Sequence, residues 1–167
     1  MTKLLRTTAA LAALTVAATP AFAAPVQPNK QATANVIIKK PLTLTWVQDL
    51  DLGTITLVGS GSTTVGISKA GVFSCPGTEV ACSGTTQVAR YHVTGVNNQV
   101  VNVTAGNVTL TNATADQLLM TVDAPASVTL PNSGSSGTDI DIGGNVTVSG
   151  ATVDGTYQGT FAVTVNY

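Results

Sequence analysis

Few side chains in this sequence are able to do chemistry, and the single histidine is the first of them. His92 stands in "RYHVTG", where no G-x-S-x-G elbow or other nucleophile motif accompanies it. Nucleophilic catalysis would need a nucleophile, a base within hydrogen-bond reach and a group that orients the base. We therefore interpret His92 as an ordinary strand residue and expect that the protein is not an enzyme.

Two pairs of aspartates form the second pattern. Asp49 and Asp51 ("QDLDLG") and Asp139 and Asp141 ("TDIDIGG") are each spaced i, i+2, which places both carboxylates of a pair on one face of a strand. Carboxylate oxygens bind calcium, but neither pair continues into the ligand spacing of an EF-hand loop. The apolar residues between the aspartates predict strands whose acidic face meets solvent, so we expect no metal and no cofactor.

The amino terminus has the pattern of a secretory signal peptide. Lys3 and Arg6 precede the apolar run "LAALTVAA", and a small-x-small cleavage site follows at Ala21-Phe22-Ala23. No later apolar run reaches the roughly 18 residues of a membrane-spanning helix. We expect residues 1–23 to be removed, no membrane insertion, and export through the periplasm to the cell surface or beyond.

Two cysteines, Cys75 and Cys82, lie close together in "SCPGTEVACSG". In an exported chain this spacing favours a local disulfide. Zinc is the alternative, but no histidine or further cysteine stands near the pair in the sequence to complete a ligand set.

Beyond the signal peptide the chain is weakly acidic and rich in residues that suit strands. Eight acidic residues outnumber five basic ones, so the balance is about −3, which argues against nucleic acid as a partner. The abundance of Thr, Val, Gly, Asn and Ser favours strands joined by tight turns. The basic residues are Lys30, Lys39, Lys40, Lys69 and Arg90.

Alternating apolar residues mark both ends of the remaining chain. Residues 24–40 are predicted to be a mobile leader that ends in "QATANVIIKK", and a proline follows. The closing run "GTYQGTFAVTVNY" alternates in the same way, which indicates a strand with one buried face. On the amino-terminal run, one face consists of Ala32, Ala34, Val36 and Ile38.

Residues 41–167 are predicted to form a single β-sandwich domain. Short alternating runs are separated by Gly, Asn, Ser and Pro turns about every 8 to 12 residues, which is typical of an all-β sandwich or barrel. Only "ATADQLLMTVD" has any helical character.

The order of these features resembles chaperone–usher pilus subunits. The segments "ATANVIIKKPLTLTWVQDLDLGTI" and "GTYQGTFAVTVNY" are also similar to the two ends of a pilin-like domain-of-unknown-function family of secreted proteobacterial proteins. One feature departs from the pilus subunits: many of them carry a cysteine soon after the amino-terminal segment, whereas both cysteines here lie in one mid-chain loop.

The resemblance implies an immunoglobulin-like antiparallel β-sandwich that lacks one strand, which a donor strand from the next subunit completes. It implies a structural subunit of an extracellular fibre, or pilus, with a role in surface adhesion. Its partners would be other copies of itself or related subunits, a periplasmic chaperone and an outer-membrane usher. The donor face would be Ala32, Ala34, Val36 and Ile38, and the acceptor groove would be lined by Phe161, Val163, Val165 and Tyr167.

A different function is also compatible with the residues. In this alternative the protein is a self-complete secreted β-sandwich that binds a partner or a surface glycan. The amino-terminal segment would then pair with its own sheet.

Overall fold

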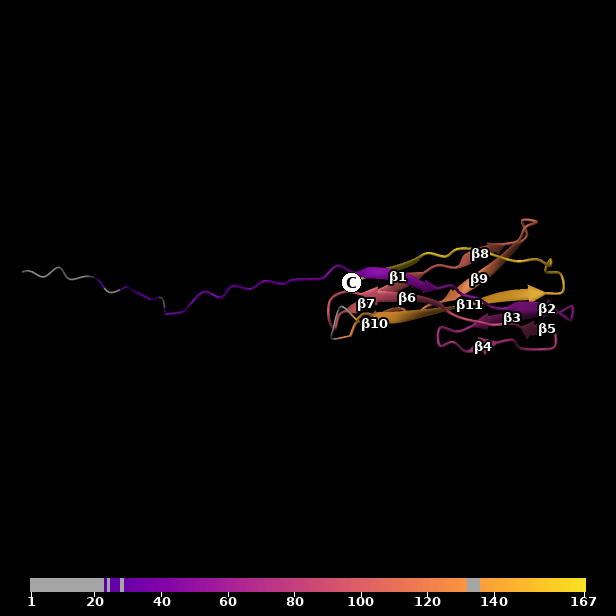
Figure 1. Cartoon of the computed structure of the whole chain (residues 1–167), viewed down its shortest axis with the longest axis horizontal. Coiled ribbons are helices and arrows are strands. Elements are labelled where there is room, and N and C mark those ends of the chain that lie inside the picture. Colours follow the sequence, from indigo (N-terminus) through magenta and orange to yellow (C-terminus); the bar gives the residue numbers. More distant parts are fainter. Residues whose placement is uncertain (1–22, 24, 28, 132–135) are drawn as a thin grey trace, which may run out of the picture. The chain divides into compact units, whose positions relative to one another are not determined.

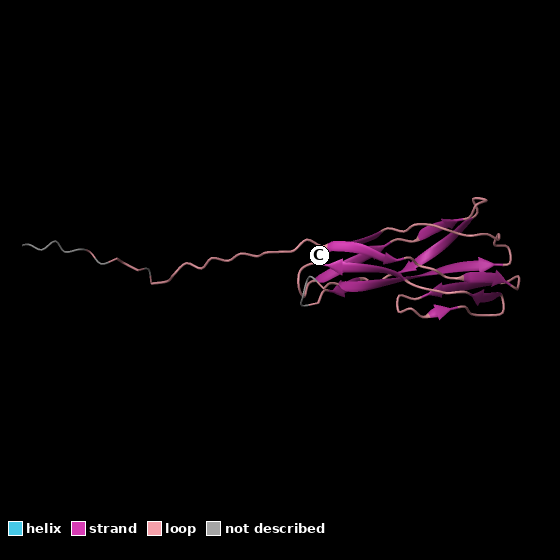
Figure 2. Cartoon of the chain, viewed as in Figure 1, coloured by secondary structure: helices cyan, strands magenta, loops and turns pink. Residues whose placement is uncertain are grey.

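The computed structural model describes residues 23, 25–27, 29–131 and 136–167. This part of the chain contains antiparallel strands and no helix (Figure 1 and Figure 2), so the all-β sandwich-like fold is confirmed. Its strands are β1 (Thr43–Gln48), β2 (Thr54–Leu57), β3 (Ser62–Ile67), β4 (Phe73–Ser74), β5 (Val80–Ser83), β6 (Ala89–Thr94), β7 (Val100–Ala105), β8 (Val108–Thr111), β9 (Gln117–Asp123), β10 (Ser127–Thr129), β11 (Thr138–Ser149) and β12 (Val163–Asn166).

The described residues before β1 form no strand. The apolar side chains of Val36, Ile37 and Ile38 are 82%, 85% and 83% exposed. The predicted signal peptide, residues 1–23, lies outside the described residues except for Ala23. Three consecutive large apolar side chains are therefore open to solvent.

In one half of the domain, called the closed half below, two sheets pack face to face and enclose a core. β1, β6 and the first part of β11 form one sheet, and β10, β7 and β12 form the other. Alternation turns every second residue of each strand inward. Val93, Val101 and Ile142 are among the fully buried members of this first core cluster.

The long strand β11 belongs to both halves of the domain. Residues 138–142 pair with β6, whereas residues 144–149 pair with β3 and residues 143–146 with β9. A Cβ atom on Gly143 would collide with the backbone of Ile67, so the glycine permits the close approach at the point where β11 passes from one half to the other.

In the second half, one sheet is covered by a ladder of only two strands. The sheet consists of β8, β9, the end of β11, β3 and β4, and the ladder consists of β2 and β5. Between them lies a second core cluster, which includes Val65, Met120 and Val146. Within the described residues, β2 and β5 form a ladder with no other strand.

Paired charges occupy the outer face of β6 and β11. Arg90 donates hydrogen bonds of 2.6 and 2.8 Å to Asp141, and Nδ1 of His92 lies 2.7 Å from Asp139. Both pairs join residues that are opposite each other in the β6–β11 register. The aspartates of "TDIDIGG" therefore face outward, while Ile140 between them is buried in the first core cluster.

Acid is expected to weaken the fold through Asp123. The side chain and the backbone N–H of Lys69 donate to this carboxylate at 2.8 and 2.9 Å, and these bonds hold the pKa of Asp123 below its usual value. A pKa lowered by folding contributes stability above the unfolded pKa of about 3.9, and this stability is lost as the pH falls further. The unfolding free energy should therefore decline on acidification below about pH 4.

The variant Asp123→Asn tests this expectation. It should lose up to about 1 kcal/mol at neutral pH, because the pair is partly exposed, and should decline less steeply in acid. Urea unfolding between pH 2 and 7 measures both effects. The pH dependence that remains in the variant would include a contribution from Asp116, because hydrogen bonds from Thr114 and Asn112 lower the pKa of that carboxyl. Identical pH profiles for the two proteins would contradict the assignment.

Candidate functional site

A groove of about 1360 Å³ opens in the second half of the domain. One wall is the segment 49–57, which includes β2, and the other is the segment 152–161, which leads into β12. Apolar side chains from β8, β9 and β11 form the floor. They are Leu110, Leu118, Met120, Val146 and Val148.

Both walls have backbone that is free of ladder pairing in the described part of the chain. β2 pairs with β5 along one edge only, so its other edge carries no strand. The opposite wall forms no strand, and its one backbone bridge joins Gln158 to Thr111 at 2.8 and 3.1 Å. Unpaired N–H and C=O groups along such edges are a template for an added strand.

The groove ends at the centre of the domain beside Leu50 and Phe161. Both side chains contact both core clusters, so they separate the groove from the closed half. Tyr91 also lines this inner end, where burial and the nearby charge of Asp49 raise the pKa of its hydroxyl. The inner end is thus apolar with a carboxylate at its edge.

The outer end of the groove lies where β2 finishes. The turn that follows β11 reaches this place, because Gly150 lies against the backbone of Ser60. Val58 and Val153 are 66% and 45% exposed here. β2 therefore runs from the inner end to the outer end, and the wall 152–161 runs in the opposite direction.

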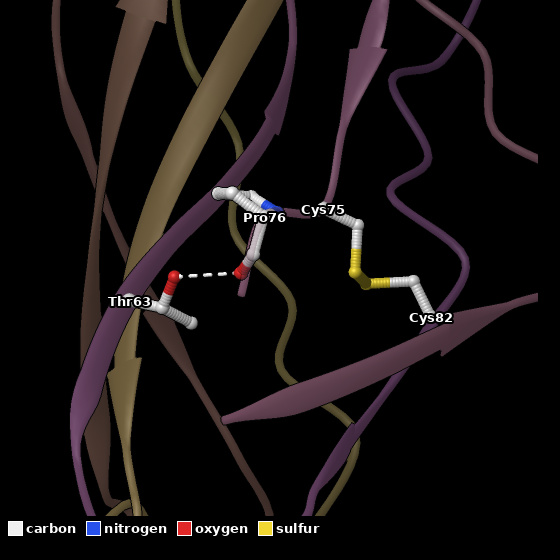
Figure 3. Close-up of a disulfide and its surroundings, with 4 residues drawn as sticks. All are labelled: Thr63, Cys75, Pro76 and Cys82. Atoms are coloured by element: carbon white, nitrogen blue, oxygen red, sulfur yellow. Dashed lines mark hydrogen bonds between the residues drawn. A yellow bond between two sulfur atoms is a disulfide. The ribbon is translucent and has the colours of Figure 1, made fainter. Parts of the chain in front are cut away.

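The predicted disulfide between Cys75 and Cys82 is confirmed (Figure 3). Cys75 follows β4, at the edge of the large sheet, and Cys82 lies in β5. The bond therefore ties the β2–β5 ladder to the sheet that it covers. Thr63 of β3 supports the same loop, because its hydroxyl donates to the carbonyl of Pro76 at 3.0 Å.

Of the four residues predicted to line an acceptor groove, Phe161 lies on the groove between residues 49–57 and 152–161. Val163 and Val165 lie in β12 opposite Ala105 and Val103 of β7, and they pack on the first core cluster. The closing strand thus continues past the groove into the closed half of the domain.

Tyr167, the fourth of these residues, lies where the amino-terminal segment meets the domain. Its hydroxyl donates to the carbonyl of Lys40 at 3.1 Å and accepts the backbone N–H of Val96 at 2.8 Å. The Lys39 ammonium lies 5.9 Å from the centre of its ring, within the range of a cation–π contact. Tyr167 therefore anchors residues 39 and 40, the last residues of the amino-terminal segment, to the domain.

The predicted donor residues Ala32, Ala34, Val36 and Ile38 belong to no strand, and all four are exposed. The residues of the β2 wall were not predicted for the site, although β2 itself alternates exposed Thr54 and Thr56 with half-buried Ile55 and Leu57. Alternation could have placed Ile55 and Leu57 on one inward face. It could not have shown that one edge of their strand is bare.

The remaining candidates for chemistry hold local structure. Asp49 accepts the indole N–H of Trp46 at 3.0 Å, and Asp51 accepts the N–H of Gly53 at 2.8 Å, where Gly53 has a φ of 71°. Among the described residues, no three acidic, histidine or cysteine side chains gather as metal ligands. The same residues contain no helix of the length and apolarity needed to cross a bilayer.

The chain belongs to a protein family defined by a domain of unknown function, DUF4402, whose model matches residues 42–167. The match covers β1 to β12, and therefore both walls and the floor of the groove. Comparison with curated proteins and with solved structures gave no match.

Proposed function

We propose that this protein is a structural subunit of an extracellular fibre, in which residues 31–38 of one copy fill the groove of the next. The observation that carries the proposal is the groove between β2 and residues 152–161, which has an apolar floor and, in the described part of the chain, two walls without a strand between them. The exposed alternating segment of the same chain has the composition that such a groove accepts.

The occupant is a strand, because the groove lies between two extended walls. An added strand would form ladders with both walls, and each hydrogen bond would contribute about 0.5 to 1.5 kcal/mol. Val36 and Ile38 would each contribute roughly 1.5 to 3 kcal/mol on burial against the floor. Ordering the free segment costs about 1 to 2 kcal/mol per residue, so only full insertion is favourable.

The direction of insertion follows from the two ends of the domain. Figure 1 shows the C-terminus beside the start of β1, and β2 and β5 at the opposite end of the domain. The amino-terminal segment joins the domain at the first end, since Lys40 is bonded to Tyr167, and the groove opens at the second. A segment that enters a neighbour's groove from the outer end runs parallel to β2 and antiparallel to residues 152–161.

This geometry produces an open chain of copies. The donating segment is attached to one end of the domain through Lys40, and the accepting groove opens at the other end, so each contact leaves one free segment and one free groove at the ends of the assembly. Such a head-to-tail contact extends into a filament instead of closing into a dimer.

An apolar groove also has consequences before assembly. A newly exported subunit would expose its groove to aggregation, so we propose that a periplasmic chaperone covers it and that an outer-membrane usher receives the subunit. The fibre would then stand on the cell surface, with a role in adhesion. These partners and this location rest on the sequence resemblance and on the bare groove.

Electron microscopy together with hydrogen exchange tests the proposal. Cells that produce the chain should carry fibres that are absent without the gene. In isolated fibres, the amides of residues 31–38 should exchange at least about 100-fold more slowly than in the monomer, because each would join a ladder. A chain that remains monomeric, or a fibre in which these amides exchange freely, would rule the proposal out.

A further inference from the structure

We infer that charges at the two ends of the groove fix the register of the inserted strand, with Lys30 and Lys40 of the donor beside aspartates of the acceptor. This inference rests on the proposed function. It concerns the specificity of the contact, which an apolar groove alone does not provide.

Among the described residues, the charges that form no ion pair differ in sign between the amino-terminal segment and the domain. Among the described residues, the ion pairs occupy Lys69 and Arg90, with His92 in a third pair. The basic residues of this described part that form no ion pair are Lys30, Lys39 and Lys40, all of which belong to the amino-terminal segment.

The acidic residues complement this distribution. Five carboxylates of the described chain form no ion pair: Asp49, Asp51, Glu79, Asp116 and Asp154. Three of them, Asp49, Asp51 and Asp154, line the groove, and no basic residue lines it. The acceptor is thus acidic where the donor is basic.

The positions of the acids match the two ends of the groove. Asp49 and Asp51 flank Leu50 at the inner end, whereas Asp154 lies beside Val153 at the outer end. The place of Asp154 is fixed by Asn112, whose side-chain amide donates to its carbonyl at 3.4 Å.

The donor segment carries its charges at a corresponding spacing. In an extended strand Lys30 and Lys40 point to the same side as Ala32, Ala34, Val36 and Ile38, so the apolar face has a lysine at each end. Ten residues span about 33 Å, and the wall from Asp49 to Leu57 spans at most about 26 Å. Each lysine would therefore stand just outside the apolar floor, beside the acids.

The two lysines would prevent a shift in the register of the donor strand. A shift of the donor by two residues keeps the same face inward but drives one lysine over the apolar floor, where a charge without a partner is costly. Lys39 differs, because it points to the other side of the strand and lies over its own Tyr167. A matched control for Lys30 and Lys40 is thus available in the same segment.

Charge reversal tests the inference on the whole chain. Lys30→Glu and Lys40→Glu should each lower the fibre recovered per exported subunit by about fivefold or more, and Lys39→Glu should not. Asp154→Lys should lower the yield when alone and restore it when combined with Lys40→Glu, because the opposite charges then meet again between neighbours. The melting temperature of each monomer, which should stay the same, shows that folding is unaffected.

The outcomes separate this inference from the function on which it rests. If fibres form equally well from all the variants, or if Asp154→Lys fails to restore Lys40→Glu, the charges do not set the register while the fibre remains. If the unmodified chain forms no fibre, the proposed function fails and this inference fails with it.

Discussion

Replacing Ile38 by aspartate should abolish fibre formation and leave the domain as stable as before. The side chain of Ile38 is 83% exposed, so the substitution removes little packing within the subunit. In the proposed fibre the same position would face the groove, where an unpaired carboxylate costs several kcal/mol and the burial of isoleucine would be lost. Fibre yield should fall at least about 100-fold, as measured by electron microscopy and by the mass of fibre sheared from cells.

The neighbouring residue provides the control. Ile37 has the same side chain and is 85% exposed, but it points to the opposite face of an extended segment. Ile37→Asp should therefore retain fibre formation to within a few-fold. Equal loss in the two variants would mean that apolar surface alone, without strand register, drives assembly. Unfolding of the monomer by Ile38→Asp would instead favour a segment that pairs with its own sheet.

Replacing both Cys75 and Cys82 by serine should weaken the domain by about 2.5 kcal/mol, because the disulfide closes a loop of eight residues in the unfolded chain. The loss should be visible as a lower midpoint of urea unfolding. Fibre yield should fall as well. The disulfide ties the β2–β5 ladder to the sheet below it, and one edge of that ladder is a wall of the groove.

A milder substitution nearby distinguishes the contribution of the disulfide from that of the hydrogen bond beside it. Thr63→Val removes the 3.0 Å hydrogen bond to the carbonyl of Pro76 and keeps the covalent bond, so it should cost no more than about 1 to 2 kcal/mol. An unfolding midpoint that is the same in the unmodified protein and in the serine variant would show that packing alone holds β2 and β5.

The sequence was sufficient for the fold class because alternation is a local property. The inward residues of β6 and β11, such as Val93 and Ile142, follow directly from it. The one segment with helical character, "ATADQLLMTVD", contributes β9 to the large sheet. Its residues Leu118 and Met120 form part of the groove floor, so partners distant in the sequence decided its conformation.

The site was less predictable because it depends on which strands are neighbours. Phe161 lines the groove between β2 and residues 152–161, whereas Val165, four residues later on the same strand face, pairs with β7 in the closed half. Alternation indicates that one face of a strand is buried but not which strand covers it. The wall that contains Ile55 was missed for the same reason, since a bare edge is a property of the sheet.

The bond between Tyr167 and the carbonyl of Lys40 bears on how the fibre would respond to tension. A pull on the inserted segment would pass through residues 39–42 into β1, in line with that strand. β1 is held by β6 in an antiparallel ladder, so the hydrogen bonds from Thr43 to Trp46 would be loaded together in shear and not peeled apart singly. Because this bond lies within two residues of Ile38, the load on an inserted segment would reach the domain close to the groove of the neighbouring subunit.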